Sequence, residues 1–271
     1  MNILGCFKIV PDLDMLPEDD WVYDENFYID VKYVKNMWNC FDESALEMML
    51  KLSDLSEGFN VLFRFEALTI GNEKCDSYLR TLYALGYGKA VRVECNDDLR
   101  FRPELVARSV AGYVNKTGDK DVIVMGRQTS DGNNEKTPLI LAEYLGWPCI
   151  TNVMKMEPFD DNHIKVISEI DEGILTQVVK TPCVISVGNV AESYLRVPTL
   201  KDRMKLGKQP IEIYKPEDLG VTDELGQATV EICGLEKPDN GREGIIIEGS
   251  TPAEKALKLY NEYLKERLEK L

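Results

Sequence analysis

The stretch that decides the fold is Val124-Met-Gly-Arg-Gln-Thr-Ser-Asp-Gly-Asn-Asn-Glu-Lys-Thr-Pro138. Just before it, the apolar run Asp121 to Met125 predicts a strand that is buried on both faces. Just after it, Pro138 to Leu145 predicts a helix that ends at Gly146. The loop Gly126 to Thr137 therefore places backbone N–H groups near a helix N-terminus, where the helix dipole favours an anion such as phosphate. The loop matches neither a P-loop nor a GxGxxG fingerprint, so an ordinary strand-to-helix loop without a ligand remains the alternative.

The same order of strand, loop and helix recurs on the N-terminal side of this stretch. Apolar runs predict strands at 3–7, 60–70 and 89–94, and amphipathic runs predict helices at 42–52, 75–85 and 103–115. We expect Asp42 to cap the first of these helices. Strands that alternate with helices in this way form a parallel sheet with helices on both faces, as in Rossmann-like α/β folds.

The pattern changes after Pro148, where apolar runs follow one another with short turns between them. These runs predict three antiparallel additions to the sheet and one returning strand, at 150–154, 163–170, 175–179 and 183–187. We therefore expect an α/β domain over residues 1–209 and an extended C-terminal arm over 210–271 that ends in a helix.

The C-terminal helix is predicted from a start signal and an apolar stripe. Thr251-Pro-Ala-Glu254 has the residues of a capping box with proline at the first helical position. One helical face then carries apolar side chains at Leu257, Tyr260, Leu264, Leu268 and Leu271. We expect this face to dock on another chain, and packing against its own domain is the alternative.

Composition narrows the range of partners and compartments. The chain has 271 residues, 44% of them hydrophobic, and a net charge of -15. An acidic surface disfavours nucleic acid and anionic membranes, so the partner is expected to be a protein or a small molecule. The sequence has no apolar run of the roughly 18 residues that a membrane span needs, and no signal-peptide pattern at its start. A cytoplasmic protein is therefore predicted.

Neither catalytic residues nor a metal site are predicted. The seven cysteines are odd in number and form no CxxC pair, which argues against a disulfide framework, an iron–sulfur cluster or a cysteine zinc site. The single histidine, His163, lies in Asp160-Asp-Asn-His163, a pattern typical of a hairpin turn rather than of a catalytic triad.

Several motifs together resemble the beta (small) subunits of electron-transfer flavoproteins. The first strand and loop Cys6–Asp12, the helix start Asn39-Cys-Phe-Asp-Glu-Ser-Ala-Leu-Glu47 and the loop Gly126-Arg-Gln-Thr-Ser-Asp-Gly132 occur in the order and spacing of that family. Leu141–Pro148, Arg196–Leu200 and Ile211–Val221 also resemble family sequence, so the similarity runs nearly end to end.

The resemblance implies a non-catalytic electron-carrier subunit that pairs with a larger alpha subunit in a heterodimer. The alpha subunit would hold most of the FAD that passes electrons on from acyl-CoA or other flavin dehydrogenases. The small subunit would bind a second adenine nucleotide, which is AMP in simple carriers and a second FAD in electron-bifurcating members that use NADH. The sequence leaves open which of the two this chain binds.

The resemblance also implies which residues contact the nucleotide. They come from the ends of the first, second and fourth predicted strands and from the first helix start, and they are Cys6, Asn39, Cys40, Phe41, Asp42, Ile70, Gly126, Arg127, Gln128, Thr129, Ser130, Asp131, Gly132, Asn133, Asn134, Glu135, Lys136 and Thr137. Open parallel sheets bind ligands at the carboxyl ends of their strands, which independently favours this edge. The chain departs from the family pattern at Cys40, where proline is usual, at Lys136, where glutamine is usual, and at Leu13, where some members have tyrosine.

A second implied site is the loop at about residues 190–208, which in the family anchors partner dehydrogenases. Leu200 is the expected anchor, and basic residues that are unusual in so acidic a chain follow it: Lys201, Arg203, Lys205 and Lys208. Such a cluster can steer an acidic partner, although a solvated basic face is the alternative.

Two other classes share a parallel sheet with an adenine site. One is the stress-protein or ATP-pyrophosphatase type of module without a redox role, but its Ser-Gly-Gly-x-Asp-Ser or glycine-rich phosphate loop is not found in this sequence. The other is a purely structural adenylate-binding subunit. A larger flavoprotein that co-purifies with the chain would distinguish the carrier subunit from both.

Overall fold

The computed structural model describes residues 1–25, 27–59, 61–191, 193–222, 232–236, 241 and 244–269. The chain forms two compact units, Met1–Cys233 and Gly234–Leu271. The second unit holds α6 (Pro252–Leu259), the short π-helical turn η6 (Tyr260–Leu264) and α7 (Lys265–Leu268). The predicted domain boundary at 209/210 stays a prediction, and parts of the arm lie outside the described residues, among them Leu271 of the apolar stripe.

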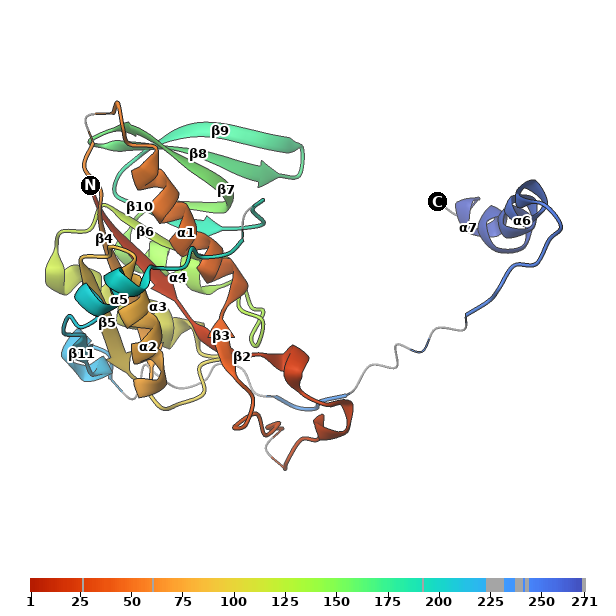
Figure 1. Ribbon diagram of the computed structural model, residues 1–271, viewed down its shortest axis with the longest axis horizontal. Helices are drawn as coiled ribbons and strands as arrows, with labels where there is room; N and C mark the ends of the chain where they lie inside the picture. The colour runs from red at the N-terminus through yellow and green to blue at the C-terminus, as the bar shows by residue number, and fades with distance from the viewer. Residues whose placement is uncertain are drawn as a thin grey trace. The chain divides into compact units, whose positions relative to one another are not determined.

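The described part of the first unit is built on a nine-stranded sheet with the order β11-β5-β4-β1-β6-β10-β7-β8-β9 (Figure 1). The parallel strands are β1 (Asn2–Phe7), β4 (Arg64–Gly71), β5 (Lys89–Glu94), β6 (Val122–Gly126), β10 (Cys183–Val187) and β11 (Glu212–Tyr214). The strand β7 (Cys149–Asp160) pairs in parallel with β10. On its other side, β8 (His163–Ile170) and β9 (Gly173–Lys180) add antiparallel strands.

Helices cover both faces of this sheet. Buried residues of α1 (Cys40–Asp54) and α2 (Asp76–Ala84) pack in one hydrophobic cluster with Ile3 of β1. Buried residues of α3 (Pro103–Thr117) and α4 (Thr137–Leu145) pack in a second cluster with Leu4, the next residue of the same strand. Successive side chains of a strand point to opposite faces, so both faces of the parallel strands are apolar. The predicted α/β class, with its antiparallel additions, is confirmed.

Shorter elements connect the main ones. A separate two-stranded sheet joins β2 (Ile9–Pro11) to β3 (Asn36–Trp38), and between them lie the 3₁₀ turns η1 (Leu13–Met15) and η2 (Glu18–Asp20). Two more 3₁₀ turns, η3 and η4, cover Glu73–Cys75 and Pro216–Leu219. The short helix α5 (Leu200–Lys205) carries part of the basic cluster.

Three local details differ from the sequence expectations. The prediction that Asp42 caps α1 is wrong, because Asn39 occupies the N-cap position and Asp42 lies in the first turn. The basic segment was expected to be a loop, but α5 forms there because the Thr199 hydroxyl accepts a hydrogen bond of 3.2 Å from the Asp202 backbone N–H. The short strand β11 was not predicted, since three residues are too few for a periodic signal.

The start of the C-terminal helix agrees with the expectation. The Thr251 side chain accepts a hydrogen bond from the Glu254 backbone N–H at 3.2 Å. The Glu254 carboxylate in turn accepts from the Ser250 backbone N–H at 2.8 Å, one residue before the position that a standard capping box uses. Both bonds satisfy N–H groups at the helix start, so α6 is well capped.

The end of β6 lies very close to the start of α1, and this approach requires glycine. A Cβ added to Gly126 would lie 2.6 Å from the Cβ of Phe41 and 2.7 Å from the Oδ1 of Asp42. Since real Cβ atoms do not approach so closely, any side chain here would push the helix away from the strand.

We therefore expect Gly126→Ala to lower the free energy of unfolding by about 1–3 kcal/mol, as measured by urea unfolding. The matched control is Gly88→Ala, because the nearest atom to an added Cβ there, the Phe65 carbonyl oxygen, is 3.7 Å away. Equal stability of the two variants would contradict the close approach of β6 and α1.

Candidate functional site

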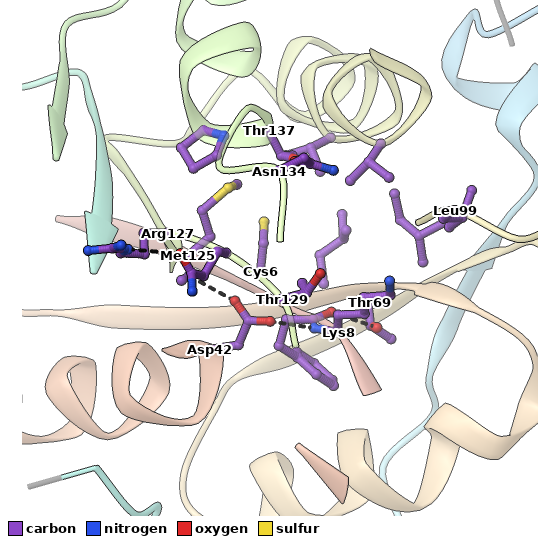
Figure 2. Close-up of a pocket in the computed structure, with 18 of the residues that line it drawn as sticks. Cys6, Lys8, Asp42, Thr69, Leu99, Met125, Arg127, Thr129, Asn134 and Thr137 are labelled. Atoms are coloured by element: carbon purple, nitrogen blue, oxygen red, sulfur yellow. Dashed lines mark hydrogen bonds between the residues drawn. The ribbon is translucent and has the colours of Figure 1, made fainter. Parts of the chain in front are cut away.

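A pocket opens at the carboxyl ends of β1, β4 and β6 (Figure 2). The strand β1 lies between β4 and β6. From β1 the chain first builds the sheet outward on one side through β4 and β5, and then continues on the other side of β1 with β6, so the carboxyl end of β1 is a topological switch point. Apolar side chains from β4, α3 and β6 line one part of the pocket, namely Leu68, Ile70, Val106, Val110 and Met125. Polar side chains come chiefly from the β6–α4 loop and include Arg127, Gln128, Thr129, Asn134 and Thr137.

The carboxylate of Asp42 joins three segments at this edge. Its Oδ1 accepts a hydrogen bond from the Gly126 backbone N–H at 2.8 Å, and its Oδ2 accepts from the Lys8 backbone N–H at 2.9 Å. Only 4% of Asp42 is exposed. Burial raises the pKa of Asp42 to about 6, although the hydrogen bonds from Lys8, Gly126 and Asn39 oppose the shift. At neutral pH the group is therefore an ionised acceptor that fixes the ends of β1 and β6 on α1.

Asn39 holds the next part of the loop. Its Nδ2 donates to the Gln128 carbonyl oxygen at 2.8 Å and to the Asp42 Oδ2 at 3.0 Å. Its Oδ1 accepts from the Ser130 backbone N–H at 3.2 Å. Asn39 is fully buried, so its amide holds the loop in place from inside the protein and is not exposed in the pocket.

Asp131 joins the middle of the β6–α4 loop to Lys8, the residue that follows β1. One oxygen, Oδ2, forms a 2.6 Å ion pair with the Lys8 ammonium. The other oxygen, Oδ1, is buried and has no hydrogen-bond partner among the described residues. A buried acceptor without a partner is unusual in native proteins.

Arg127 is held on the side of the pocket by several partners. Its guanidinium forms a 2.8 Å ion pair with Glu135, donates to the Asn152 side chain at 3.3 Å and lies 5.7 Å from the centre of the Phe41 ring. Glu135 and Asn133 both have positive φ angles, 55° and 46°, so the loop curls tightly before α4.

Arg100 links the loop to the segment before α3. Its guanidinium pairs with Asp98 at 2.7 Å and lies 5.1 Å from the centre of the Tyr28 ring. Its backbone carbonyl accepts a hydrogen bond from the Asn134 side chain at 3.1 Å. The Asp98 carboxylate supports a raised pKa of the guanidinium, which therefore stays cationic at the pocket wall.

The structure divides the predicted nucleotide residues into two groups. Nine of them line the pocket: Cys6, Asp42, Ile70, Gly126, Arg127, Gln128, Thr129, Asn134 and Thr137. The others are not among the lining residues: Asn39, Cys40, Phe41, Ser130, Asp131, Gly132, Asn133, Glu135 and Lys136. Their role as contacts stays a prediction.

Sequence reasoning missed ten lining residues. They are Phe7, Lys8, Leu68, Thr69, Leu99, Arg100, Val106, Val110, Met125 and Pro138. Half of them are apolar residues of strands and of α3, where an ordinary core position has the same sequence signal as a pocket wall. Lys8 and Thr69 could have been found, because both lie at or near the carboxyl ends of the strands β1 and β4.

The second predicted site lies on α5 and the residues before it. Leu200 is 75% exposed, and two further apolar side chains, Val197 and Met204, are similarly exposed. The four predicted basic residues are exposed as well: Lys201, Arg203, Lys205 and Lys208. The structure therefore places an apolar group and a basic group together, and Val197 and Met204 are additions to the prediction.

Three further features concern the single histidine, metal binding and membrane spans. His163 begins β8 and lies 2.9 Å from Asp160, across the turn that the sequence predicted. Among the described residues, no group of three or more histidine, cysteine, aspartate or glutamate side chains is arranged to hold a metal ion. No helix in the described ranges combines the length and apolar character of a membrane span.

Comparison with known proteins identifies the family. The profile described as "Electron transfer flavoprotein domain" matches residues 32–219. The chain is 33% identical over 271 residues to the "Putative electron transfer flavoprotein subunit YgcR" of Escherichia coli (strain K12), covering 99% of this chain and 100% of that one. It is 30% identical over 219 residues to the "Electron transfer flavoprotein subunit beta" of Homo sapiens, covering 79% and 81% of the two chains. The corresponding subunit of Bacillus subtilis (strain 168) is 28% identical over 222 residues, covering 82% and 83%. The chain therefore belongs to the beta-subunit family of the electron transfer flavoproteins.

Proposed function

We propose that this chain is the small subunit of a heterodimeric electron transfer flavoprotein and that it binds an adenine nucleotide, AMP or a second FAD, in the pocket at the end of β1. The observation that carries the proposal is the pocket itself. It combines an apolar wall with cationic and amide donors at the switch point of a parallel sheet. Membership of the family supports a flavin in the complex.

The residues present fit such a nucleotide. Ile70, Leu99 and Val106 are partly exposed in the lining and offer apolar surface suited to an adenine ring. Asn134, Thr137 and the first turn of α4 offer hydrogen-bond donors suited to a phosphate, and the helix dipole adds to them. The nucleotide would supply an anion and a stacking surface, and FAD would also supply a redox centre. In this proposal the chain itself binds and orients the nucleotide and catalyses no reaction on its own.

The same proposal assigns α5 and its approach to docking. In this assignment, Leu200 enters an apolar pocket of a flavin dehydrogenase while Lys201, Arg203, Lys205 and Lys208 attract an acidic surface around that pocket. Support comes from the exposure of Leu200, Val197 and Met204 beside the basic side chains. Electrons would then pass to the FAD held mainly by the large subunit, and bifurcation with NADH is a further option if the second nucleotide is FAD.

The C-terminal arm, residues 210–271, is assigned to the large subunit. The first residues of the arm belong to the first unit, where β11 pairs with β5 and Leu219 of η4 is buried. The helical elements α6, η6 and α7 have no buried residue, and the apolar side chains of Leu257, Tyr260, Leu264 and Leu268 are all exposed. An apolar stripe of this kind gains about 25 cal/mol for each Å² that a partner covers. The full-length similarity to the Escherichia coli relative shows that the arm is shared by at least one other family member.

The nucleotide assignment predicts the effect of changing the start of α4. Lys136→Ala combined with Thr137→Val removes one cation and one hydroxyl, and a charge-assisted hydrogen bond contributes about 1.5–3 kcal/mol. We expect about 10- to 100-fold weaker nucleotide binding with an unchanged fold. The measurement is acid release and identification of bound AMP and FAD from the heterodimer. Lys155→Ala on β7 is the control, and full nucleotide retention by the double variant would refute this site.

The arm assignment predicts that deletion of residues 251–271 weakens association with the large subunit. Analytical ultracentrifugation of the co-expressed subunits measures the effect. The paired variants Leu257→Ser and Leu264→Ser should weaken association as well, whereas Lys255→Ala and Glu262→Ala on the polar residues should leave it unchanged. Association that is insensitive to the deletion would rule out a docking role for this helix.

The docking assignment predicts different effects for the apolar and the basic residues. Leu200→Ala should weaken the dehydrogenase complex by about 2–4 kcal/mol at any ionic strength, mainly through faster dissociation. Neutralising the basic residues should slow association chiefly at low salt, where screening is weak. Electron transfer from a reduced dehydrogenase to the heterodimer, titrated against salt, distinguishes the two. Leu62→Ala, at an exposed leucine before β4, is the control. Wild-type rates for Leu200→Ala at sub-saturating concentrations would refute the docking site.

A further inference from the structure

The segment that leads into α5 is fixed to α1 by a set of polar contacts. Residues 193–199 belong to no helix or strand, yet they set the direction in which α5 leaves the protein. The Glu43 carboxylate accepts from the Leu195 backbone N–H at 3.1 Å, and the Ser44 hydroxyl donates to the Ser193 carbonyl at 3.3 Å. The side chain of Leu195 is buried in the hydrophobic cluster between α1 and the sheet. This segment is therefore anchored just before its exposed part begins.

Glu47 makes the strongest of these contacts. Its Oε2 accepts from the Arg196 backbone N–H at 2.9 Å. Its Oε1 accepts from the Arg196 Nε and Nη2 at 2.9 and 2.7 Å. The same carboxylate thus holds both the backbone and the guanidinium of one residue. Charge-assisted bonds in this forked geometry are stronger and more directional than single neutral bonds.

Burial makes this contact unusual for a helix surface. Glu47 is only 5% exposed, although it is a charged residue on a helix that begins at the edge of the sheet. Leaving such a carboxylate unpaired in the interior is unfavourable, so the folded protein gains from keeping Arg196 in place. Arg196 also contacts Asp54 at 2.7 Å, but Asp54 is largely exposed and solvent weakens that pair.

The connection from Arg196 to Leu200 is short and stiff. Only Val197, Pro198 and Thr199 lie between them, and the proline ring fixes one backbone angle. Thr199 then caps α5 through its side chain. With so few free torsions, the position of Arg196 largely determines where the Leu200 side chain points.

We propose that Glu47 is a positioning residue for dehydrogenase docking, acting through Arg196 to hold Leu200 in its binding orientation; the inference rests on the docking role proposed for α5. A segment held in place before the encounter loses less conformational entropy on binding than a free one. Removing the Glu47 carboxylate should therefore weaken docking without changing the electron-transfer step in the formed complex. Glu47 itself touches neither partner nor cofactor in this proposal.

The direct test is hydrogen exchange of the heterodimer followed by mass spectrometry. In Glu47→Gln, the amide exchange of a peptide covering residues 193–205 should rise on the order of tenfold, because the Arg196 fork is lost. Peptides from the middle of α1 and the thermal unfolding temperature should change little. Asp54→Asn is the matched control, since it alters the exposed partner of the same guanidinium, and its effect should stay below about twofold.

Arg196→Lys gives an independent reading if Glu47→Gln disturbs α1. The Arg196 side chain is 39% exposed, and lysine keeps a cation beside the buried Glu47 carboxylate while it removes the forked guanidinium contact. The same rise in exchange over 193–205 supports the proposal. Unchanged exchange of this peptide in both variants overturns it, and so does an equal rise throughout α1, which would show a purely structural role.

A double-mutant cycle with Leu200→Ala connects the positioning to docking. For the dehydrogenase that reduces the wild-type heterodimer, Glu47→Gln should raise KM on the order of tenfold with kcat unchanged. In the Leu200→Ala background the same substitution should have almost no further effect, because its anchor is gone. Additive effects overturn the proposal. If Leu200→Ala alone has no effect, the docking function fails, and the exchange measurement still decides whether Glu47 positions the segment.

Discussion

The buried carboxylate of Asp42 is the interaction on which the rest of the site depends. It accepts backbone hydrogen bonds from the ends of β1 and β6 while it belongs to the first turn of α1. Because its pKa rises from 3.8 to about 6 on folding, ionised Asp42 lowers the free energy of unfolding by about 3 kcal/mol, and this loss develops as the pH rises from about 4 through 6. Only the ionised form offers one acceptor oxygen to each of the two N–H groups. Ionised Asp42 therefore fixes the ends of β1 and β6 on α1, although its burial lowers the stability of the fold.

The two ends of the α1 polar face serve two different parts of the molecule. At the N-terminal end, Asn39 and Asp42 hold the loop that follows β6. Glu43, the residue after Asp42, and Glu47, about one turn further on, hold the segment that leads to Leu200. A single rigid helix, packed into the core by Leu46 and Met49, thus fixes the geometry of both the proposed nucleotide site and the proposed docking site. This arrangement explains why α1 buries three polar residues, Asp42, Ser44 and Glu47.

The sequence alone was sufficient for the architecture and insufficient for the support of the site. Strands such as Val122–Gly126 are continuous apolar runs, and their alternation with helices determines a parallel sheet. The edge at which the pocket opens followed from the rule that parallel sheets carry their sites at the carboxyl ends of the strands. The roles of Glu47 and Arg196 could not be predicted, because their pairing joins positions 149 residues apart. Arg100 was missed for the same reason, since only the fold brings it to the loop through Asn134. The sequence gives no local signal for contacts of this kind.

The departures from the family pattern now have a structural interpretation. Cys40, where proline is usual, is exposed at the first position of α1, and the neighbouring Asn39 provides the hydrogen bonds that fix the loop, so the helix start does not depend on a proline ring. Glu135 forms an ion pair with Arg127 across the loop, so the negative charge of Glu135 is balanced and repels a bound anion less. Lys136 is then left exposed beside the start of α4, with the helix dipole behind it. The local charge that a phosphate would meet at the start of α4 is therefore positive, even though the chain as a whole carries a net charge of -15.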